Sequence, residues 1–424
     1  MSATATATIR AHALAGRTAA AQGELRTLIT RLFALPAETL TINADQYSLN
    51  SLNGFFESGG QKFFFKFHQE ENEDSTSGEY YRAAILADAG LPVDMPVHVS
   101  SQPGEQILIY RRRTDPRFAD ILRSLDTTPN PALHAAALAA ERTLSEQIFE
   151  TYTATLHPIT AAQSAAEPIH RLFHHRLTDG GAFPGGRYAS FYINQNFAFP
   201  GLEIPWAELK DLRFAINGIA YADTLESLFA QAATILHPAA LATVGGLTAH
   251  GDAHNANVWF QERDGETSLA FFDPAFAGAH IPALLAEVKA TFHNIFAHPF
   301  WLYDPALATA RFSATARRTE THLHIETNWR LSPIRADLLA IKGATIWRPL
   351  LTLLRTRGML PPDWRRIVKL ALFLCPTLVM NLRAGAATHT PTSSSIALAA
   401  AIMAGSEPSA PDLFSDFLDS IDPG

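Results

Sequence analysis

Residues 248–274 read TAHGDAHNANVWFQERDGETSLAFFDP and are the most informative segment of the chain. Two short apolar runs, Val258–Phe260 and Leu269–Phe272, flank a polar turn that contains Asp264 and Gly265. Apolar runs joined by an Asp-Gly turn are the signature of a β-hairpin. The two ends of an antiparallel hairpin lie side by side, so residues that precede the first strand are predicted to meet residues that follow the second.

Polar side chains occupy both ends of this predicted hairpin: Asp252, Asn257 and Asp273. Two carboxylates and an amide suit Mg²⁺, which prefers oxygen ligands and keeps waters and substrate phosphates in its coordination shell. A carboxylate outside that shell can orient a hydroxyl group and accept its proton. A base at the start of a loop, an Asn at its end and an Asp after the following hairpin together indicate phosphoryl transfer.

The motif His-Gly-Asp-x-x-x-x-Asn at residues 250–257, followed later by two apolar residues and Asp273, resembles the aminoglycoside phosphotransferases and choline kinase-like small-molecule kinases. These families share the protein kinase fold. The resemblance implies that Asp252 is the catalytic base and that Asn257 and Asp273 bind Mg²⁺. It also implies that His250 supports the loop. Relatives often have Asp-Phe-Gly where this chain has Asp-Pro-Ala, but the metal ligand is retained.

A second pattern within the motif suggests a different metal. His250 and His254 lie four residues apart, a spacing that zinc sites also use. Neither a nearby cysteine nor a His-Glu-x-x-His helix accompanies them, so the sequence disfavours zinc. Single His, Asp and Asn residues before a strand are usually turn or cap residues. Their combination at this spacing around one hairpin favours the kinase-like interpretation.

The composition is that of a globular protein with a large core, because 47% of the 424 residues are hydrophobic and 17% are charged. This length predicts one to three domains. The formal net charge of −8 argues against general nucleic-acid binding. The expected partner is a small molecule that carries a hydroxyl group, and the sequence gives no indication of the oligomeric state.

The single cysteine, Cys375, excludes an internal disulfide and lies in an apolar run, which indicates a buried thiol. The longest apolar run, Ile367–Leu382, is interrupted by Lys369, Pro376 and Asn381 and is too short to span a bilayer. It predicts a buried helix that ends near Pro376. The N-terminus lacks the continuous apolar region of a secretory signal. These features predict a cytoplasmic protein without a membrane span.

The N-terminal region is predicted to contain an antiparallel sheet. Residues 22–34 carry apolar side chains at helical spacing and predict one helix, whereas Met1–Ile9 are expected to be frayed. Glu38–Gln46 alternates between polar and apolar residues and predicts a first strand. Gly54–Ser58 and Gln61–His68 flank a Gly-Gly turn and predict a hairpin.

The loop before this hairpin, Ser48–Gly54, would cover the nucleotide in a kinase-like fold. Its backbone N–H groups and small polar side chains can reach phosphate oxygens. The loop contains only one glycine, and Ser and Asn are also common turn formers. Ser51 and Asn53 are therefore candidate phosphate contacts on the basis of their position alone.

Lys66 stands inside the aromatic strand Phe63–Phe67, where it must lie on a solvated face or meet an anion. The family resemblance implies that it contacts the nucleotide phosphates and pairs with a glutamate of the next helix. That helix is predicted over Ser77–Gly90, which ends at a C-cap glycine, and Glu79 in its first turn is the predicted partner. Two alternatives stay open: Lys62 for the lysine and Glu73 for the glutamate.

Gln106–Tyr110 is a predicted buried strand. In the resembling family this strand leads to the backbone that meets the adenine ring, so Ile109 and Tyr110 are the predicted adenine contacts. The run Arg111–Arg113 follows directly. Such a charged run is usually a solvated face, and anion binding is the alternative.

The remainder of the chain is predicted to be mainly helical, with helices within residues 119–165 and 208–236. A polar, aromatic and glycine-rich stretch at residues 172–199 lies between them, where the family resemblance places the acceptor site. Residues 311–383 contain thirteen Lys or Arg against four acidic residues. This surplus indicates solvated helix faces or, alternatively, an anion-binding surface, and it argues against a polycationic aminoglycoside as the acceptor.

Three further features concern residues after the catalytic motif. Glu287 and Lys289 fall in a predicted helix beneath the active site and are expected to face solvent, with pairing to each other's neighbours as the alternative. Residues 385–395 are a polar loop, expected at the surface, with a contact to the acceptor as the alternative. Apolar residues within the acidic tail, Asp412–Asp422, predict that this tail docks as an amphipathic helix.

Together these features predict an α+β protein with a two-lobed protein kinase-like fold. An antiparallel-sheet lobe that binds the nucleotide is expected at residues 1–110, and a mainly helical lobe that carries the catalytic loop and the acceptor site at residues 111–424. The predicted activity is ATP- and Mg²⁺-dependent transfer of the γ-phosphoryl group to a hydroxyl of a sugar, amino alcohol or antibiotic. The alternative is a catalytically silent kinase-like binding protein. The single glycine in the predicted nucleotide loop and the arginine run at residues 111–113 favour this alternative. Retention of Asp252, Asn257 and Asp273 favours the enzyme.

Overall fold

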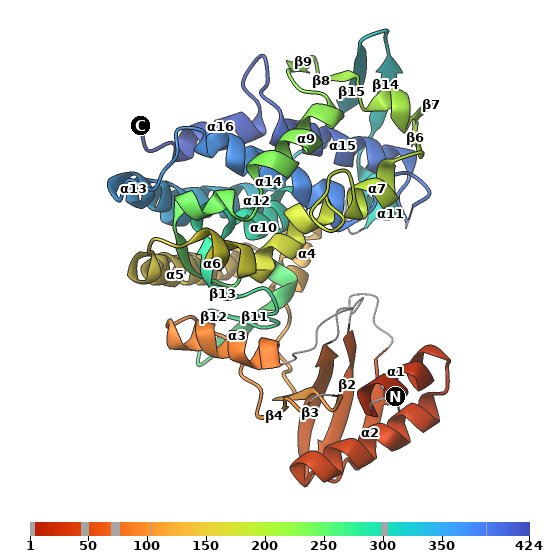
Figure 1. The fold of residues 1–424 in the computed structure, drawn as a ribbon, viewed down its shortest axis with the longest axis vertical. Helices are drawn as coiled ribbons and strands as arrows, with labels where there is room; N and C mark the ends of the chain where they lie inside the picture. Colours follow the sequence, from red (N-terminus) through yellow and green to blue (C-terminus); the bar gives the residue numbers. More distant parts are fainter. Residues whose placement is uncertain (1–4, 44–50, 69–76, 103, 298–303, 387) are drawn as a thin grey trace. The chain divides into compact units, whose positions relative to one another are not determined.

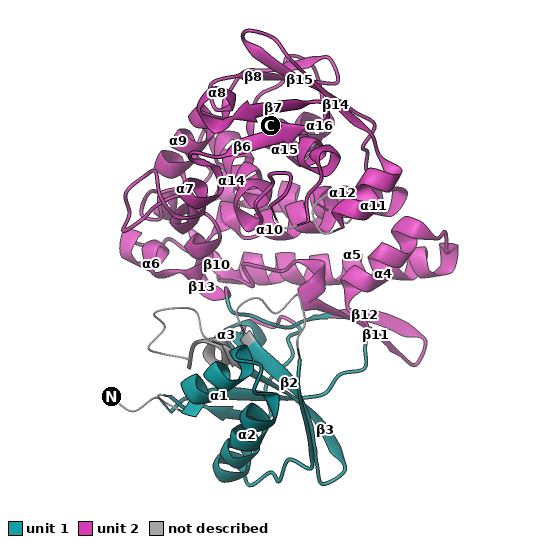
Figure 2. Cartoon of the chain, turned by 90° about the vertical axis from the view of Figure 1, so that its right-hand side faces the viewer, with its two compact units in different colours: residues 1–88, 92–115, 270–275 teal, residues 89–91, 116–269, 276–424 magenta. Residues whose placement is uncertain are grey.

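The structure is a computed structural model that describes residues 5–43, 51–68, 77–102, 104–297, 304–386 and 388–424, with only the backbone described at 51, 67–68 and 77–81. The chain forms two compact units (Figure 2). Unit 1 comprises residues 1–88, 92–115 and 270–275, and unit 2 comprises residues 89–91, 116–269 and 276–424. The predicted α+β class is confirmed, with an antiparallel sheet in unit 1 and mainly helices in unit 2. The predicted division into functional lobes at residue 110 stays a prediction.

Unit 1 is built on a five-stranded sheet, in which the strands pair antiparallel in the order β1-β2-β3-β5-β4. The strands are β1 (Thr39–Ile42), β2 (Ser51–Ser58), β3 (Gln61–His68), β4 (His98–Ser100) and β5 (Ile107–Arg111). Gly59 and Gly60, at φ 56° and 73°, form the turn between β2 and β3. Two-residue hairpin turns favour this conformation, which glycine adopts without strain. The predicted Gly-Gly hairpin is confirmed.

Helices α1 (Ala5–Leu14) and α2 (Thr18–Phe33) share one buried apolar cluster with this sheet. The cluster includes Phe63 and Phe65, so these side chains face the two helices. Because side chains alternate along a strand, Lys66 lies on the opposite face. The prediction of a helix over residues 22–34 is confirmed by α2. The expectation of a frayed N-terminus is wrong for residues 5–9, since Ile9 is 1% exposed and anchors α1 in the cluster.

Unit 2 is mainly helical (Figure 1). Its α-helices are α4 (Phe118–Thr127), α5 (Pro131–Thr155), α6 (Ala161–Ala166), α7 (Gly186–Tyr192), α8 (Trp206–Leu209), α9 (Leu225–Ile235), α10 (Val288–Thr291), α11 (Pro305–Arg311), α12 (Pro333–Lys342), α13 (Arg348–Thr356), α14 (Trp364–Val379), α15 (Pro391–Gly405) and α16 (Leu413–Ile421). Shorter 3₁₀ and π-helical turns are η1 (Pro168–Leu172), η2 (His174–Arg176), η3 (Ala240–Val244), η4 (Asn255–Asn257), η5 (Ala283–Leu285), η6 (Phe292–Phe296) and η7 (Gly343–Trp347). The Asn130 side chain caps α5 by accepting a hydrogen bond from the backbone N of Leu133 at 3.1 Å, and Pro131 at the first helical position helps to start the helix there.

A four-stranded sheet of unit 2 occupies sequence that was predicted to be helical. Its order is β14-β15-β8-β9, and the strands are β8 (Arg213–Ile216), β9 (Ile219–Tyr221), β14 (Ala314–Arg318) and β15 (His322–Thr327). Asn217 and Gly218, at φ 49° and 81°, form the turn between β8 and β9. The prediction of helix over residues 208–236 is therefore wrong between the end of α8 at Leu209 and the start of α9 at Leu225. An Asn-Gly turn between short apolar runs favours a hairpin there. The β15–β8 pair is parallel and joins segments that are distant in sequence.

The remaining strands form three two-stranded sheets. They pair β6 (Asn196–Phe199) with β7 (Leu202–Pro205), β10 (Gly246–Ala249) with β13 (Gly278–Pro282), and β11 (Val258–Arg263) with β12 (Glu266–Phe271). Asp264 and Gly265, between β11 and β12, have φ values of 55° and 82°. This left-handed pair is what the predicted Asp-Gly turn requires, and the hairpin is confirmed.

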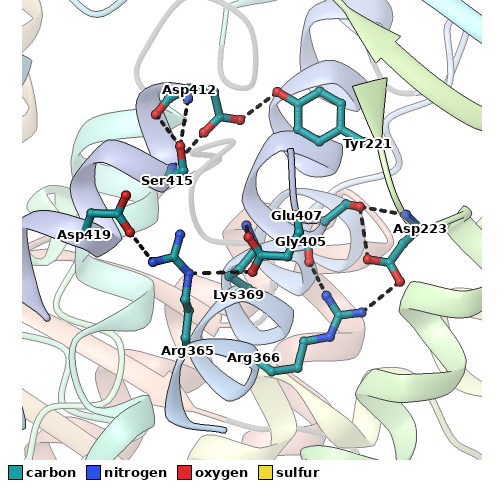
Figure 3. A network of polar contacts seen from close by, with 11 residues as sticks. Tyr221, Asp223, Arg365, Arg366, Lys369, Gly405, Glu407, Asp412, Ser415 and Asp419 are labelled. Carbon is teal, nitrogen blue, oxygen red and sulfur yellow. Dashed lines mark hydrogen bonds and ion pairs between the residues drawn. The ribbon is translucent and has the colours of Figure 1, made fainter. Parts of the chain in front are cut away.

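A polar network fixes the C-terminal helix to the rest of unit 2 (Figure 3). Asp412 caps α16, because its Oδ1 accepts a hydrogen bond from the backbone N of Ser415 at 2.7 Å. Its Oδ2 accepts a hydrogen bond from the Tyr221 hydroxyl at 2.6 Å. Arg366 of α14 donates to Asp223 at 3.0 Å. Four apolar side chains of α16 are buried: Phe414, Phe417, Leu418 and Ile421. The predicted docking of the acidic tail is confirmed.

Several cations of the basic region, residues 311–383, are used inside unit 2. Arg335 pairs with Asp126 at 2.8 Å, and both side chains are at most 1% exposed. Lys342 and Lys369 are also buried. For these three cations the local surplus of charge reflects internal pairing and not an exposed anion-binding surface. None of the described helices has the length and apolar character that crossing a bilayer requires.

Candidate active site

Unit 1 brings together a lysine and a carboxylate that lie 207 residues apart in the sequence. Lys66 Nζ donates to Asp273 Oδ1 at 2.5 Å, and the lysine side chain is 9% exposed. Backbone hydrogen bonds attach the segment before Asp273 to the loop after α3 (Ser77–Asp88). Phe271 N donates to Pro92 O at 2.7 Å, and Asp94 N donates to Phe271 O at 2.8 Å. This attachment places the carboxylate against the ammonium group of the β3 lysine.

Asp273 has a backbone φ of 56°. Few residues other than glycine adopt this left-handed conformation, although Asp and Asn tolerate it better than most. Conformations of this kind cluster at functional sites, where the surrounding structure enforces them. The conformation of Asp273 therefore supports a functional role for its carboxylate.

The predicted pair between Lys66 and Glu79 stays a prediction. Glu79 lies in α3 (Ser77–Asp88), but its side chain is outside the described residues, as is the whole of the alternative Glu73. The alternative lysine, Lys62, is a surface residue whose side chain is 64% exposed. Burial therefore distinguishes Lys66 as the better candidate for phosphate binding.

The predicted phosphate loop, Ser48–Gly54, is shorter than expected at its C-terminal end. The pairing of β2 with β3 extends back to Ser51, which lies opposite His68. Ser51 and Asn53 therefore belong to a strand and not to a loop. The first three residues of the predicted loop lie outside the described residues, and so does the Ser51 side chain. Asn53 pairs with Lys66 in the ladder and therefore shares its face of the sheet. Its role as a phosphate contact stays a prediction.

Ile109 and Tyr110, the predicted adenine contacts, lie in the buried strand β5. The carbonyl of Ile109 accepts a hydrogen bond from the backbone N of Val97 at 2.7 Å. That carbonyl is thus engaged within the sheet. The predicted contact with adenine stays a prediction for both residues.

The arginine run that follows β5 has structural contacts. The Arg112 guanidinium lies over the ring of Phe55, 4.3 Å from its centroid. Arg113 pairs with Asp94 at 2.7 Å. These contacts account for two of the three arginines without an anionic ligand.

In unit 2, a short loop between β10 and η4 carries Asp252. Gly251 has a φ of 75°, and a Cβ at this position would lie 2.4 Å from the Phe276 carbonyl oxygen, so a larger residue does not fit. His250 is 3% exposed, and its Nδ1 accepts a hydrogen bond from the backbone N of Asp252 at 3.3 Å. This contact supports the predicted role of His250 as a loop-supporting residue.

Asn257 closes the loop at its other end. Its Nδ2 donates to the Asp252 carbonyl oxygen at 3.2 Å, and its backbone N donates to the His254 carbonyl oxygen at 2.7 Å. Because Nδ2 is used in this way, the side-chain oxygen is the atom of Asn257 that can bind a hard cation.

Asn294, which the sequence analysis did not single out, supports the loop from η6. Its Oδ1 accepts a hydrogen bond from the backbone N of Asn255 at 2.6 Å, and its Nδ2 donates to the Ala253 carbonyl oxygen at 3.3 Å. Asn294 is 4% exposed. A buried amide within the apolar run Phe292–Phe296 needs hydrogen-bond partners, and this requirement is the signal that could have identified it.

The expectation that Glu287 and Lys289 face solvent is wrong, because the two residues are 1% and 3% exposed. All four residues of α10 are buried, so polar side chains in and beside it need internal partners. Glu287 accepts a hydrogen bond from Lys342 at 3.1 Å. Lys289 Nζ lies 3.7 Å from Asp252 Oδ1 and 2.9 Å from His293 Nε2.

These neighbours control the charge of Asp252. Burial by itself raises the pKa of Asp252, but nearby cations outweigh burial and the pKa is lowered from its usual value. The largest of their effects comes from Lys289, followed by His254, His250 and Arg176. Burial lowers the pKa of Lys289, and Asp252 offsets this only in part. Asp252 is thus held as a carboxylate, the form that a general base requires.

Asp252 and Asn257 belong to unit 2 and Asp273 to unit 1, so their convergence at one end of the β11–β12 hairpin stays a prediction. Within the described residues, no group of three or more His, Cys, Asp or Glu side chains has a metal-binding arrangement. Mg²⁺ does not require such a group, because one or two carboxylates, waters and substrate phosphates complete its shell. The donor set of Asn257 and Asp273 fits this requirement.

Polar side chains in the predicted acceptor stretch, residues 172–199, make contacts within unit 2. Arg187 donates to the Leu378 carbonyl oxygen at 3.0 Å. The Tyr188 hydroxyl donates to Glu226 at 3.1 Å. These two side chains therefore have structural roles, and the acceptor contacts stay unassigned.

Residues 385–395 are not the plain surface loop that was expected. Thr390 caps α15 by accepting a hydrogen bond from the backbone N of Ser393 at 3.1 Å, so the helix begins inside this segment. His389 is 4% exposed, and its Nδ1 lies 3.1 Å from Ser393 Oγ. The capping interaction explains the density of hydroxyl groups without an acceptor.

Comparison with known proteins gives matches among solved structures only, since no protein-family model and no curated protein matches the chain. Spectinomycin phosphotransferase, crystallised with ADP and spectinomycin, is 10% identical over 90% of this chain and 98% of its own, with a TM-score of 0.38. A thermostable mutant of an aminoglycoside phosphotransferase is 13% identical over 82% and 89%, with a TM-score of 0.41. A putative fructosamine-3-kinase from Thermobifida fusca is 13% identical over 89% and 98%, with a TM-score of 0.35.

These similarities are to proteins named as phosphotransferases or kinases. Identities this low and TM-scores below 0.5 leave the activity of this chain to be inferred from its own residues.

Proposed function

We propose that this protein is a phosphotransferase that moves the γ-phosphoryl group of ATP to a hydroxyl group of a sugar, an amino alcohol or an antibiotic. The observation that carries the proposal is the ion pair between Lys66 and Asp273 in unit 1. A strand lysine and a carboxylate directly after a hairpin are two of the parts that phosphoryl transfer requires. The loop that precedes the same hairpin supplies two more, Asp252 and Asn257.

Asp252 is the proposed base. The acceptor oxygen forms a bond to the γ-phosphorus, the bond from that phosphorus to the bridging oxygen breaks, and ADP leaves. The hydroxyl proton passes to the Asp252 carboxylate, whose lowered pKa keeps it ionised and able to accept the hydrogen bond from the hydroxyl. Because the transition state is loose, the main contribution of Asp252 is to orient the hydroxyl.

Asn257 and Asp273 are the residues that would hold Mg²⁺, through an amide oxygen and a carboxylate. Bound Mg²⁺ would neutralise charge on the β- and γ-phosphates. Lys66 would bind phosphate oxygens, and its contact with Asp273 supports placing both beside the same phosphates. The further nucleotide contacts in this proposal are Ser51, Asn53, Glu79, Ile109 and Tyr110.

Release of ADP from MgATP tests the proposal, measured over a panel of sugars, amino alcohols and aminoglycosides. At least one acceptor should accelerate ADP release, and Asp252→Ala should lower the rate by about 10²–10⁴-fold while MgATP binding stays within a few-fold. Unchanged turnover in a folded Asp252→Ala variant would contradict the assignment of the base. MgATP binding without transfer to any acceptor would instead favour the silent kinase-like binding protein.

A further inference from the structure

A buried lysine lies directly behind the proposed base, and the reaction described above gives it no role. Lys289 is 3% exposed, and its Nζ is 3.7 Å from Asp252 Oδ1. An ammonium group removed from water is costly unless a carboxylate compensates it. Asp252 is the acidic residue within salt-bridge distance of Lys289 among the described residues. The two charges are therefore mutually dependent.

The two carboxylate oxygens of Asp252 have different surroundings. Oδ1 is buried, receives no hydrogen bond from any described residue, and faces Lys289. Oδ2 lies 3.8 Å from Nε2 of His254, whose side chain is 28% exposed. Oδ1 is thus closed to solvent, whereas the Asp252 side chain as a whole is 14% exposed. This leaves Oδ2 as the oxygen for an acceptor hydroxyl.

His293 fixes the position of the lysine. Its Nε2 is 2.9 Å from Lys289 Nζ and accepts a hydrogen bond from the ammonium group. Accepting at Nε2 requires a neutral ring, and burial lowers the pKa of His293 well below its usual value. His293 is 3% exposed and lies one helical turn after Lys289, so the two side chains meet on the same side of the helix.

We propose that Lys289 is a positioning residue for phosphoryl transfer: held by His293, its ammonium group fixes Asp252 Oδ1 so that Oδ2 alone faces the acceptor hydroxyl. This assignment rests on the proposed function of Asp252. A carboxylate whose rotation is restricted before the substrate arrives needs no reorganisation at the moment of reaction. Lys289 thereby acts through Asp252 and needs no contact with the substrate.

A second buried lysine provides a matched control. Lys369 of α14 is 0% exposed, and its Nζ lies 3.6 Å from Glu407 Oε2 in the C-terminal network (Figure 3). Its burial and its distance to a single carboxylate are close to those of Lys289. Lys369→Met therefore removes another buried ammonium group of unit 2 without touching Asp252.

The first test compares turnover in Lys289→Met and Lys369→Met, using ADP release from MgATP with the best acceptor, or with water where no acceptor is found. Lys289→Met should lower kcat by about 10²-fold, with KM for MgATP within three-fold of wild type, because a misplaced base affects the reaction and not nucleotide binding. Lys369→Met should keep kcat within about two-fold although both variants lose stability. Equal kcat values for wild type and Lys289→Met would overturn the proposal, as would equal losses in the two variants.

The second test compares crystal structures of the wild type and Lys289→Met at the Asp252 side chain. We expect the carboxylate to rotate away from its original orientation, and an unchanged orientation would overturn the proposal. If Lys289→Met does not fold, His293→Leu replaces it in both tests, with a smaller loss of kcat expected. The structural readout is independent of turnover, so it separates a failure of the Lys289 assignment from a wild-type protein that transfers no phosphoryl group.

Discussion

Two buried lysines of unit 2 have opposite surroundings, although their side chains are almost equally inaccessible, at 4% exposed for Lys289 and 5% for Lys342. Lys342 Nζ lies 3.3 Å from Glu141 and 3.1 Å from Glu287. Among the described residues, Lys289 Nζ has one carboxylate within salt-bridge distance, Asp252 at 3.7 Å. Lys342 thus has two carboxylates beside its single positive charge. Lys289 has one, at a longer distance.

The acidic partners of Lys342 are also satisfied. Glu287 accepts a second hydrogen bond from the Tyr152 hydroxyl at 2.6 Å. Together these side chains tie α5, α10 and α12 into one cluster. At Asp252, in contrast, Oδ1 receives no hydrogen bond from the described residues. A saturated polar cluster stabilises a fold, whereas a buried carboxylate oxygen without a hydrogen bond depends on the nearby ammonium group to offset its charge.

The lysine pKa values follow this difference in direction. Burial lowers the pKa of Lys342, but Glu287 and Glu141 outweigh burial and the net pKa is raised. Burial also lowers the pKa of Lys289, and here the single carboxylate does not outweigh it. The pKa of Lys342 is raised by two carboxylates that also accept its hydrogen bonds, whereas Arg176 and Arg187 lower the pKa of Lys289 further.

The largest effect on stability is expected at the saturated cluster. Lys342→Met leaves Glu141 and Glu287 buried without their cation and should lower the free energy of unfolding by about 3–5 kcal/mol. Denaturant titration of the wild type and the variant measures this loss. A loss below about 1 kcal/mol would show that the cluster of Lys342, Glu141 and Glu287 does not stabilise the fold as proposed.

A third type of buried polar group extends the comparison to histidines without carboxylate partners. Burial lowers the pKa of His170 to about 4 from an ordinary value of 6.5. Below pH 6.5 the unfolded chain therefore binds a proton that the folded protein does not, and the free energy of unfolding falls until the pH reaches about 4. The loss due to this residue is on the order of 3 kcal/mol.

Denaturation midpoints between pH 7 and pH 4 test this expectation. His170→Gln should show a weaker dependence on pH than the wild type over that window, since glutamine does not titrate. The same dependence in both proteins would mean that His170 is not responsible for it. Part of the dependence should persist in His170→Gln, because the pKa values of His174 and His389 are also lowered to about 4.

A smaller effect on stability is expected at the loop support. Asn294→Ala leaves the backbone N of Asn255 and the carbonyl oxygen of Ala253 without their partner and should cost about 1–3 kcal/mol. Hydrogen exchange should increase at residues 250–257, and turnover should fall because the loop carries Asp252. Unchanged exchange in this loop would show that Asn294 does not hold it.

The parts of the fold that rest on local patterns could be predicted from the sequence. The Asp-Gly turn gave the β11–β12 hairpin, and the Gly-Gly turn gave the β2–β3 hairpin. Lys66 was identifiable because a lysine within an aromatic strand needs an anion or water. The Asn217-Gly218 turn carried an equally strong local signal, so the missed β8–β9 hairpin was an error of interpretation.

Other parts depend on contacts between distant segments. The parallel pairing of β15 with β8 cannot be read from either strand alone. Lys289 and Asn294 lie in an apolar helical run, and their partners in the Asp252 loop are about forty residues away in the sequence. A buried polar residue in such a run shows that a partner exists, but the fold decides which one.

The measurement that tests the central claim most directly is calorimetric titration of ATP into the wild type and Asp273→Ala, each with and without Mg²⁺. If Asp273 binds the metal beside the nucleotide phosphates, ATP should bind the wild type more tightly with Mg²⁺, and Asp273→Ala should lose that dependence on the metal. ATP binding that is equally tight in both proteins and indifferent to Mg²⁺, or no binding at millimolar ATP, would contradict a Mg²⁺-dependent phosphotransferase.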